Sequence, residues 1–184
     1  MKFKLPTTDR LLGVSAIIIS VLTLIIFIYQ TNIINKQSKL SVKPRLSFGR
    51  IENTNDSIVT IEQYLQNKGL GPAIISEASI IYKREKFKFD FDEFINNKYP
   101  KIEDYGNLLR TTGISKDGTI LPKEIIVIYK FEIPIYKIEE ITKYIDLNGE
   151  SLEPNWNFEV QYTSLYEDEI WTIRDKINTP IQEN

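Results

Sequence analysis

The sequence predicts a mainly β domain that follows a single transmembrane helix. Three observations support this prediction: one uncharged apolar run near the amino terminus, several short segments with alternating polarity, and many Ile, Tyr and Phe residues. β-Branched and aromatic side chains fit a pleated surface, and period-two alternation indicates half-buried strands. Several short strands separated by turn residues are typical of a sandwich or a barrel. The length of 184 residues suits one folded domain with an appendage.

The apolar run extends from Leu11 to Tyr29, and no charged residue lies between Arg10 and Lys36. About 20 such residues are needed to cross a hydrocarbon core of about 30 Å. A core helix would show a polar face, and a signal peptide would end at a small-residue cleavage site, but the sequence has neither feature. We therefore expect a tail over 1–10, a transmembrane helix over 11–30, a juxtamembrane stalk over 31–43 and the β domain over 44–184.

The flanking charges predict the orientation of this span. The amino-terminal flank carries three basic residues and one acid, whereas the other flank carries five basic residues, Lys36, Lys39, Lys43, Arg45 and Arg50. Because basic flanks favour the cytoplasm, the expected location is the inner (plasma) membrane, single-pass, with a cytoplasmic domain. Pro44 ends any helix at or before Lys43.

Seven segments show the strand pattern. They are Arg45–Glu52, Ser57–Gln66, Ala73–Lys83, Phe87–Phe91, Glu124–Ile133, Asn155–Tyr162 and Glu169–Asp175. In the fifth segment the alternation assigns Ile125, Val127, Tyr129, Phe131 and Ile133 to one face. Two stretches interrupt the pattern, 91–113 and 134–149. We expect a short helix capped by Asp92 in the first and a helix with apolar Ile138, Ile141 and Ile145 in the second, ending before Gly149.

Composition excludes several kinds of chemistry. The chain has no Cys and no His, so thiolate nucleophiles, zinc sites with sulfur or imidazole ligands, and histidine acid–base catalysis are absent. The chain has 23 basic and 25 acidic residues, and the first 43 residues hold six of the basic residues and one of the acidic ones. The domain therefore has 17 basic and 24 acidic residues, which gives it a net charge of −7. An acidic domain is a poor partner for nucleic acid. We expect no cofactor, no metal and no enzymatic activity; the acids of Tyr166–Glu169 lack the spacing of a calcium loop.

The stretch Asn67-Lys68-Gly69-Leu70-Gly71-Pro72-Ala73 raises the question of a phosphate-binding loop. A P-loop needs G-x-x-x-x-G-K-[ST], and a dinucleotide fold needs G-x-G-x-x-G before a helix. This stretch has neither motif. Gly69 and Gly71 instead suit positive φ angles, and Pro72 suits the first residue of a strand. These residues are therefore predicted to form a structural turn between two strands.

Taken together, the span, the stalk ending in "SVKPRLSF", "YLQNKGLGPAIISEASIIY", "ILPKE" and "FEVQYTSLYEDEIWT" resemble a bacterial pattern. It is that of small single-span membrane proteins with an immunoglobulin-like β-sandwich, a family of uncharacterised function. The resemblance implies a fold and a membrane address. It supplies no catalytic residue.

Trp156 and Trp171 lie in strands expected to pair, and they are either core anchors or a candidate partner surface. The expected function is a membrane-anchored interaction module that tethers the β-sandwich close to a membrane or membrane-associated protein. The alternative is an oligomeric, ligand-gated membrane effector. In that case the sandwich senses a small molecule, and helices associating through Gly13, Ser15, Ala16 and Ser20 perturb the lipid bilayer.

Overall fold

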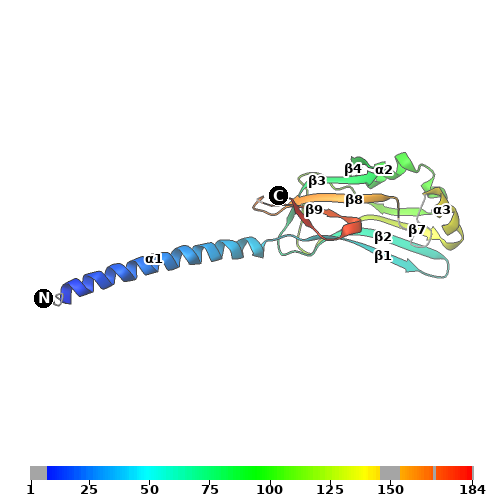
Figure 1. Ribbon diagram of the computed structural model, residues 1–184. Helices are drawn as coiled ribbons and strands as arrows, with labels where there is room; N and C mark the ends of the chain where they lie inside the picture. The colour runs from blue at the N-terminus through cyan, green and yellow to red at the C-terminus, as the bar shows by residue number, and fades with distance from the viewer. Residues whose placement is uncertain (1–7, 146–153, 168, 184) are drawn as a thin grey trace. The chain divides into compact units, whose positions relative to one another are not determined.

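The computed structural model describes residues 8–145, 154–167 and 169–183, which form two units. The first unit consists of the helix α1 (Thr8–Ser41), shown in Figure 1. The second begins at Val42 and contains all the strands. The predicted stalk therefore continues the helix up to Ser41, and Pro44 lies three residues beyond its end.

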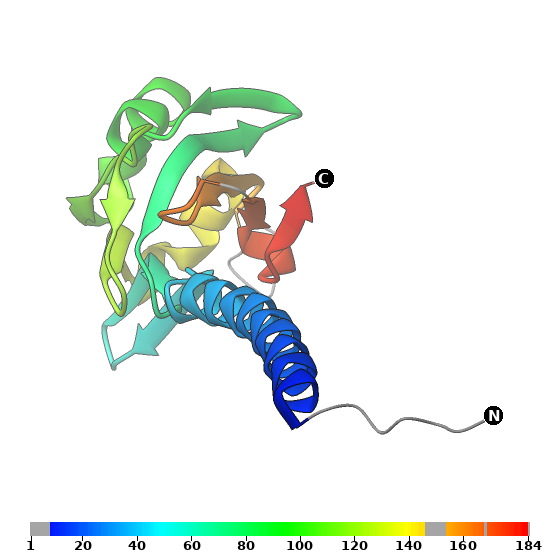
Figure 2. The ribbon, with the colours of Figure 1, turned by 90° about the vertical axis from the view of Figure 1, so that its left-hand side faces the viewer.

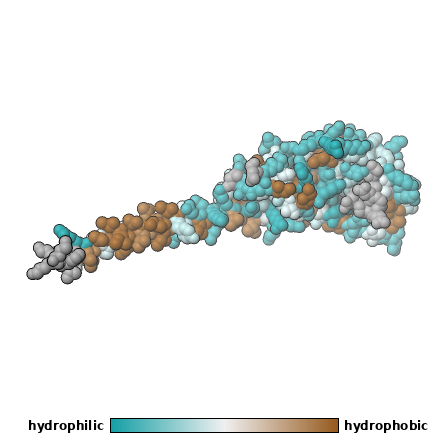
Figure 3. Space-filling model, in the orientation of Figure 1, coloured by the Kyte–Doolittle hydropathy of each residue, from teal (hydrophilic) through white to brown (hydrophobic). Residues whose placement is uncertain are grey.

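The sequence of α1 is apolar around the whole helix over the predicted span, and Figure 3 shows the brown surface on the face in view. Four of its hydroxyl groups are satisfied within the helix, because they donate to carbonyl oxygens three or four residues earlier: Ser15 to Leu12, Ser20 to Ala16, Thr23 to Ile19 and Thr31 to Phe27. Hydrocarbon offers no partner for polar groups, so internal satisfaction suits a spanning helix. Among the described residues, this is the one helix that is long and apolar enough to cross a membrane.

The second unit is built from two antiparallel sheets. The first sheet has the order β1-β2-β7-β5, and the second has β10-β9-β8-β3-β4 with β6 paired to β3. The strands are β1 (Leu46–Thr54), β2 (Ile58–Asn67), β3 (Ala73–Tyr82), β4 (Glu85–Lys88), β5 (Asn107–Thr111), β6 (Thr119–Ile120), β7 (Ile125–Pro134), β8 (Trp156–Thr163), β9 (Ile170–Arg174) and β10 (Ile181–Glu183). The mainly β prediction is confirmed, while β5, β6 and β10 are strands that the alternation did not reveal.

The core lies between the two sheets, which appear as facing layers in Figures 1 and 2. Phe158 of β8 packs against Phe48 of β1 with ring centroids 6.1 Å apart, and against Tyr129 of β7 at 6.3 Å. These aromatic pairs join the sheets directly. Each such residue removes a large apolar area from water, which makes this layer the main source of stability.

Short helices cover one end of this core. They are α2 (Phe91–Lys98), η1 (Ile102–Asp104), η2 (Ile135–Lys137) and α3 (Ile138–Tyr144), and η3 (Asp175–Ile177) follows β9. α2 and α3 fall within the two predicted excursions. The cap of α2 differs from the prediction: Asp90, not Asp92, accepts the hydrogen bond from Glu93 N at 3.1 Å. The expected end of the second helix before Gly149 lies outside the described residues.

One predicted strand face is wrong because β7 contains a bulge. Gln63 of β2 pairs with Tyr129 and Tyr64 pairs with Val127, so Ile128 is an extra residue. The bulge reverses the alternation between the residues before it and those after it, so Tyr129, Phe131 and Ile133 face the core as predicted and Ile125 does not. Ile128 is therefore fully buried, whereas Ile125 is 53% exposed rather than inward-facing.

A second correction concerns Phe87–Phe91. β4 ends at Lys88 and α2 begins at Phe91, so this segment is not one continuous strand. Phe89 and Phe91 are nevertheless both buried. The apolar spacing thus identified core residues but not the change of backbone conformation between them.

Candidate functional site

The predicted turn links the two sheets, since β2 ends at Asn67 and β3 begins at Ala73. Neither glycine has a positive φ, so the expected reason for glycine at these positions is wrong. The actual reason is close approach of another chain segment. A Cβ on Gly69 would lie 2.4 Å from Arg45 N, and one on Gly71 would lie 1.8 Å from Val42 O.

Asn67 holds this turn together from inside. Its side chain is fully buried; Oδ1 accepts from Arg45 N at 3.2 Å and Gly69 N at 2.9 Å, while Nδ2 donates to Gly71 O at 2.8 Å and Ile120 O at 3.0 Å. Backbone bonds from Leu70 N and Gly71 N to Lys43 O add to the same junction. The turn therefore fixes the first residues of the domain, immediately after α1 ends.

Trp156 and Trp171 are 3% and 5% exposed, so both indoles are core residues. The structure corresponds to the core-anchor alternative, and these two side chains do not form an exposed aromatic patch. Trp171 packs against Tyr162 at 5.7 Å, and the ammonium of Lys43 lies 5.0 Å from its ring centroid. Trp156 packs among aromatic rings at the end of the core covered by α2.

Trp156 also borders the candidate functional site, which we call the cleft. The cleft has an inner apolar cavity of about 40 Å³ and an outer groove of about 410 Å³. The two parts share four lining residues: Arg50, Tyr129, Pro154 and Trp156. They therefore form one continuous site between β1, β7, β8 and η3.

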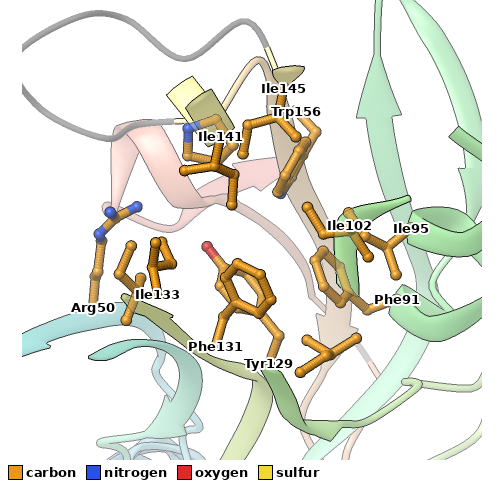
Figure 4. Close-up of a pocket in the computed structure, with 13 residues that line it drawn as sticks. Arg50, Phe91, Ile95, Ile102, Tyr129, Phe131, Ile133, Ile141, Ile145 and Trp156 are labelled. Atoms are coloured by element: carbon orange, nitrogen blue, oxygen red, sulfur yellow. The ribbon is translucent and has the colours of Figure 1, made fainter. Parts of the chain in front are cut away.

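The inner cavity is lined almost entirely by aliphatic and aromatic groups, which come from both sheets, α2, η1 and α3. Figure 4 shows Trp156 and Ile145 on one side of the space, Phe131 and Tyr129 on the other, and Arg50 at its margin. Empty apolar space is unfavourable because the lining atoms lose packing partners. A volume of this size fits a small apolar group rather than a drug-sized ligand.

The outer groove has a different chemical character. Its polar residues come from separate strands and η3: Gly49, Arg50, Gln63, Asp175, Lys176 and Asn178. Asn178 bridges the two sheets, because Oδ1 accepts from Phe48 N at 2.9 Å and Nδ2 donates to Phe48 O at 2.8 Å. This pairing fixes η3 against β1 and sets the shape of the groove.

The Trp156 indole carries the most informative polar atom of the site. Its Nε1–H has no hydrogen-bond partner within the described part of the chain, although Trp156 is only 3% exposed. An unsatisfied buried donor costs about 1–3 kcal/mol. Among the described buried polar atoms without a partner, which also include Ser76 Oγ, Ser79 Oγ and Asn157 Oδ1, this one belongs to a residue that lines the cleft, where an acceptor atom of a bound group would satisfy it.

Two other residues that line the cleft, Tyr129 and Asp175, have shifted pKa values. Desolvation raises the pKa of the Tyr129 hydroxyl to about 12, so this group remains a neutral donor at physiological pH. Desolvation also raises the pKa of Asp175 to about 6, despite hydrogen bonds from the backbone amides of Phe158 and Lys176 and the charge of Lys176. Asp175 therefore changes charge close to neutral pH.

This shift predicts a pH dependence of stability. The folded state holds the Asp175 proton more tightly than the unfolded state, where the pKa is 3.8. The contribution of Asp175 to the free energy of unfolding should therefore fall as pH rises from about 4 to about 6, by about 1–2 kcal/mol after allowance for partial exposure. Asp175→Asn should remove this slope and stabilise the protein at neutral pH. Denaturant titrations across this range test it, with exposed Asp56→Asn as the control; a slope unchanged in Asp175→Asn contradicts the prediction.

Outside the cleft, Glu159 is the most buried carboxylate that the structure describes, and it lies on the outer face of the second sheet. It is 4% exposed and accepts from Lys86 Nζ at 2.8 Å and Arg174 Nε at 2.6 Å. Desolvation acts to raise its pKa, but the hydrogen bonds from Lys86 and Arg174 bring the pKa below its usual range. This ion cluster is satisfied and joins strands β4, β8 and β9.

No group of three or more acidic residues that could hold a metal is found in ranges 8–145, 154–167 and 169–183. Sequence reasoning singled out Trp156 as a core anchor or partner surface, so one cleft residue carried a signal. Asp175 and Asn178 carried none, because Asp175 is the final residue of the last predicted strand, Asn178 lies beyond it, and both reach the site only through the sheet pairing.

Comparison with known proteins adds no assignment: no family profile, curated protein or solved structure matches the chain. The resemblance to bacterial single-span proteins therefore stays a prediction.

Proposed function

We propose that the chain is a membrane-anchored, non-catalytic binding module at the inner (plasma) membrane, with its β domain in the cytoplasm. One observation carries the proposal: a buried indole donor without a partner lies where an apolar cavity meets a polar groove. The cleft suits a group with a small apolar end and a hydrogen-bond acceptor. This group belongs to a ligand or to a partner protein at the same membrane.

Tethering supplies the functional advantage in this proposal. α1 confines the domain to a thin layer, which raises its effective concentration for partners in or on the same membrane. The cleft then supplies selectivity, because apolar walls with a few placed polar groups are typical of binding sites. A carboxylate that accepts from Trp156 Nε1–H would lie in a cleft that Arg50 also lines, and the Arg50 guanidinium there pairs with Glu52 at 3.3 Å.

The strand order supports an immunoglobulin-like topology. Such domains place strands A, B, E and D in one sheet and strands C, F and G in the other. Numbered along the chain, the order β1-β2-β7-β5 corresponds to A-B-E-D, and β9-β8-β3 corresponds to G-F-C, with β4, β6 and β10 as added strands. This fold commonly serves as a binding scaffold, which is consistent with a non-catalytic role.

Fluorine NMR tests the cleft. Full-length protein with 5-fluorotryptophan in nanodiscs should give two resonances, from Trp156 and Trp171. We expect isovalerate, which has a branched apolar end and a carboxylate, to shift the Trp156 resonance saturably and leave Trp171 unchanged. 3-Methylbutanol lacks the charge and should bind more weakly.

Matched variants make this test specific. Arg50→Gln should weaken isovalerate binding about tenfold, since charge-assisted hydrogen bonds contribute about 1.5–3 kcal/mol. Exposed Arg84→Gln should leave it unchanged. The proposal fails if the Trp156 resonance shows no saturable shift, or if both resonances move equally.

A reporter fusion tests the predicted orientation of the transmembrane helix, in which the β domain lies in the cytoplasm. A reporter that is active only outside the cytoplasm, fused after Asn184, should be silent in intact cells. Bright activity would reverse the predicted orientation and place the cleft outside.

The oligomeric effector is a second candidate, and one feature of α1 favours it. Gly13, Ala16 and Ser20 are exposed and lie on one helical face at spacings of three and four residues. Small residues at such spacing allow close helix–helix approach. Native mass spectrometry of the full chain distinguishes the candidates: a defined oligomer supports the effector, and a monodisperse monomer opposes it.

A further inference from the structure

We infer that one end of the β domain is a lipid-contact surface for anionic membranes. This inference rests on the proposed membrane anchor. The surface, called the entry end, consists of residues 42–45, 68–72, 121–124 and 164–167, which surround the point where the chain enters the domain. Hydrogen bonds and strand pairing bring these segments to one end: Lys43 O accepts from Leu70 N, Ile120 before residues 121–124 pairs with Ala73, and Thr163 before residues 164–167 pairs with Ile74.

Each loop of the entry end presents a large apolar side chain to solvent. Leu70 is 73% exposed, Leu121 58%, Leu165 56% and Tyr166 49%. These residues come from three separate connections between strands. Exposing an apolar loop tip gives the fold no packing, so their gathering at one end calls for a partner that buries them.

Chain connectivity identifies this partner as the bilayer. Only residues 42–45 separate the last residue of α1 from β1, and hydrogen bonds to the turn at 68–72 hold them in place. Four residues span at most about 14 Å. The entry end is therefore the part of the domain that the anchor must keep nearest to the membrane.

The length of α1 beyond the apolar span sets the distance between the hydrocarbon core of the bilayer and Val42, where the domain begins. Exposed Ile33 and Ile34 extend the apolar surface beyond Tyr29, so a span ending near Ile34 leaves seven helical residues, or about 10 Å, before Val42. The headgroup layer on each side is about 5–8 Å thick, and spanning helices tilt by about 20° on average. The loop tips of the entry end would need to bridge only the few ångströms that this estimate leaves between Val42 and the headgroup layer.

The charges suit an anionic surface. Arg45, Lys68 and Lys123 are exposed at the entry end. Within the entry end four basic residues, Lys43, Arg45, Lys68 and Lys123, outnumber two acids, Glu124 and Glu167; the hydrogen bond from Leu121 N leaves Glu124 charged, and Glu169 next to the entry end pairs with Lys43. Basic residues near anionic lipid attract it, and apolar side chains anchor at the interface.

The absence of cysteine makes a direct test simple, because each introduced thiol is the sole labelling site. The full chain is prepared as Leu70→Cys, Leu121→Cys and Leu165→Cys, and each is labelled with an environment-sensitive nitrobenzoxadiazole dye. The control is Tyr136→Cys, which is 78% exposed on η2, outside the entry end. Vesicles contain phosphatidylcholine and phosphatidylserine in a three-to-one ratio, with or without a nitroxide on the phosphatidylcholine headgroup.

We expect nitroxide lipid to quench the three entry-end labels about twofold and to leave the Tyr136→Cys label nearly unchanged. Vesicles without phosphatidylserine should reduce the quenching. All four labels unquenched, or all four quenched alike, would overturn the inference. Flotation of the same samples separates the two proposals: floating protein with unquenched labels rejects only the lipid-contact surface, whereas protein that does not float rejects the anchor. Unchanged tryptophan emission confirms that each variant is folded.

Discussion

Asn67→Ala should lower the free energy of unfolding by about 3–4 kcal/mol. The substitution removes four hydrogen bonds from a fully buried side chain and leaves the backbone groups of Arg45, Gly69, Gly71 and Ile120 without their partner. Each buried group left unsatisfied costs about 1–3 kcal/mol, although water entry reduces the total. Guanidinium titration of the full chain in detergent, followed by tryptophan emission, measures the change.

Asn55 supplies a matched control for this prediction. Its Oδ1 accepts from Ser57 N at 3.0 Å and Ile58 N at 2.8 Å, but the side chain is exposed in the β1–β2 hairpin. Asn55→Ala should therefore cost no more than about 1 kcal/mol. Equal effects of the two substitutions would show that Asn67 does not organise the junction.

Gly71→Ala should destabilise the domain by about 3 kcal/mol or more. The added Cβ would lie 1.8 Å from the carbonyl oxygen of Val42, and the nearest atoms belong to the backbone. Side chains cannot relieve this clash, so residues 42–45 must move and the bonds from Leu70 N and Gly71 N to Lys43 O weaken. The same titration measures the loss.

Gly113→Ala is the control for the added methyl group. Its Cβ would lie 3.1 Å from Phe89 O, with the next atom at 3.7 Å, so a shift of a few tenths of an ångström suffices. We expect a change within about 1 kcal/mol. A Gly71→Ala protein as stable as this control would contradict the close approach at the junction.

These residues show how far the sequence predicts the fold. Local patterns were sufficient for α1, for the alternating strands and for a turn at 68–72, because each depends on neighbouring residues. The reason for glycine at this turn was not visible, since it depends on Val42 and Arg45 packing against it. β5 and β6 are short and gain their order from pairing with β7 and β3, which no local pattern reports.

The cleft was predictable only in part, for the same physical reason. Trp156 stood out as an aromatic residue, but its position beside Arg50 and η3 follows from the pairing of distant strands. The bulge at Ile128 likewise changes which β7 side chains face the core. Charge and periodicity along the sequence identify helices and strands. A site that lies between strands can be predicted only when the register of their pairing is known.

The account depends most on α1 acting as a membrane anchor. Alkaline carbonate extraction of membranes from cells that produce the full-length chain tests this directly. We predict that the protein stays with the membrane pellet and enters solution only when detergent is added, because burying the apolar surface of α1 in lipid is strongly favourable. Recovery of folded, full-length protein in the aqueous fraction without detergent would contradict the account.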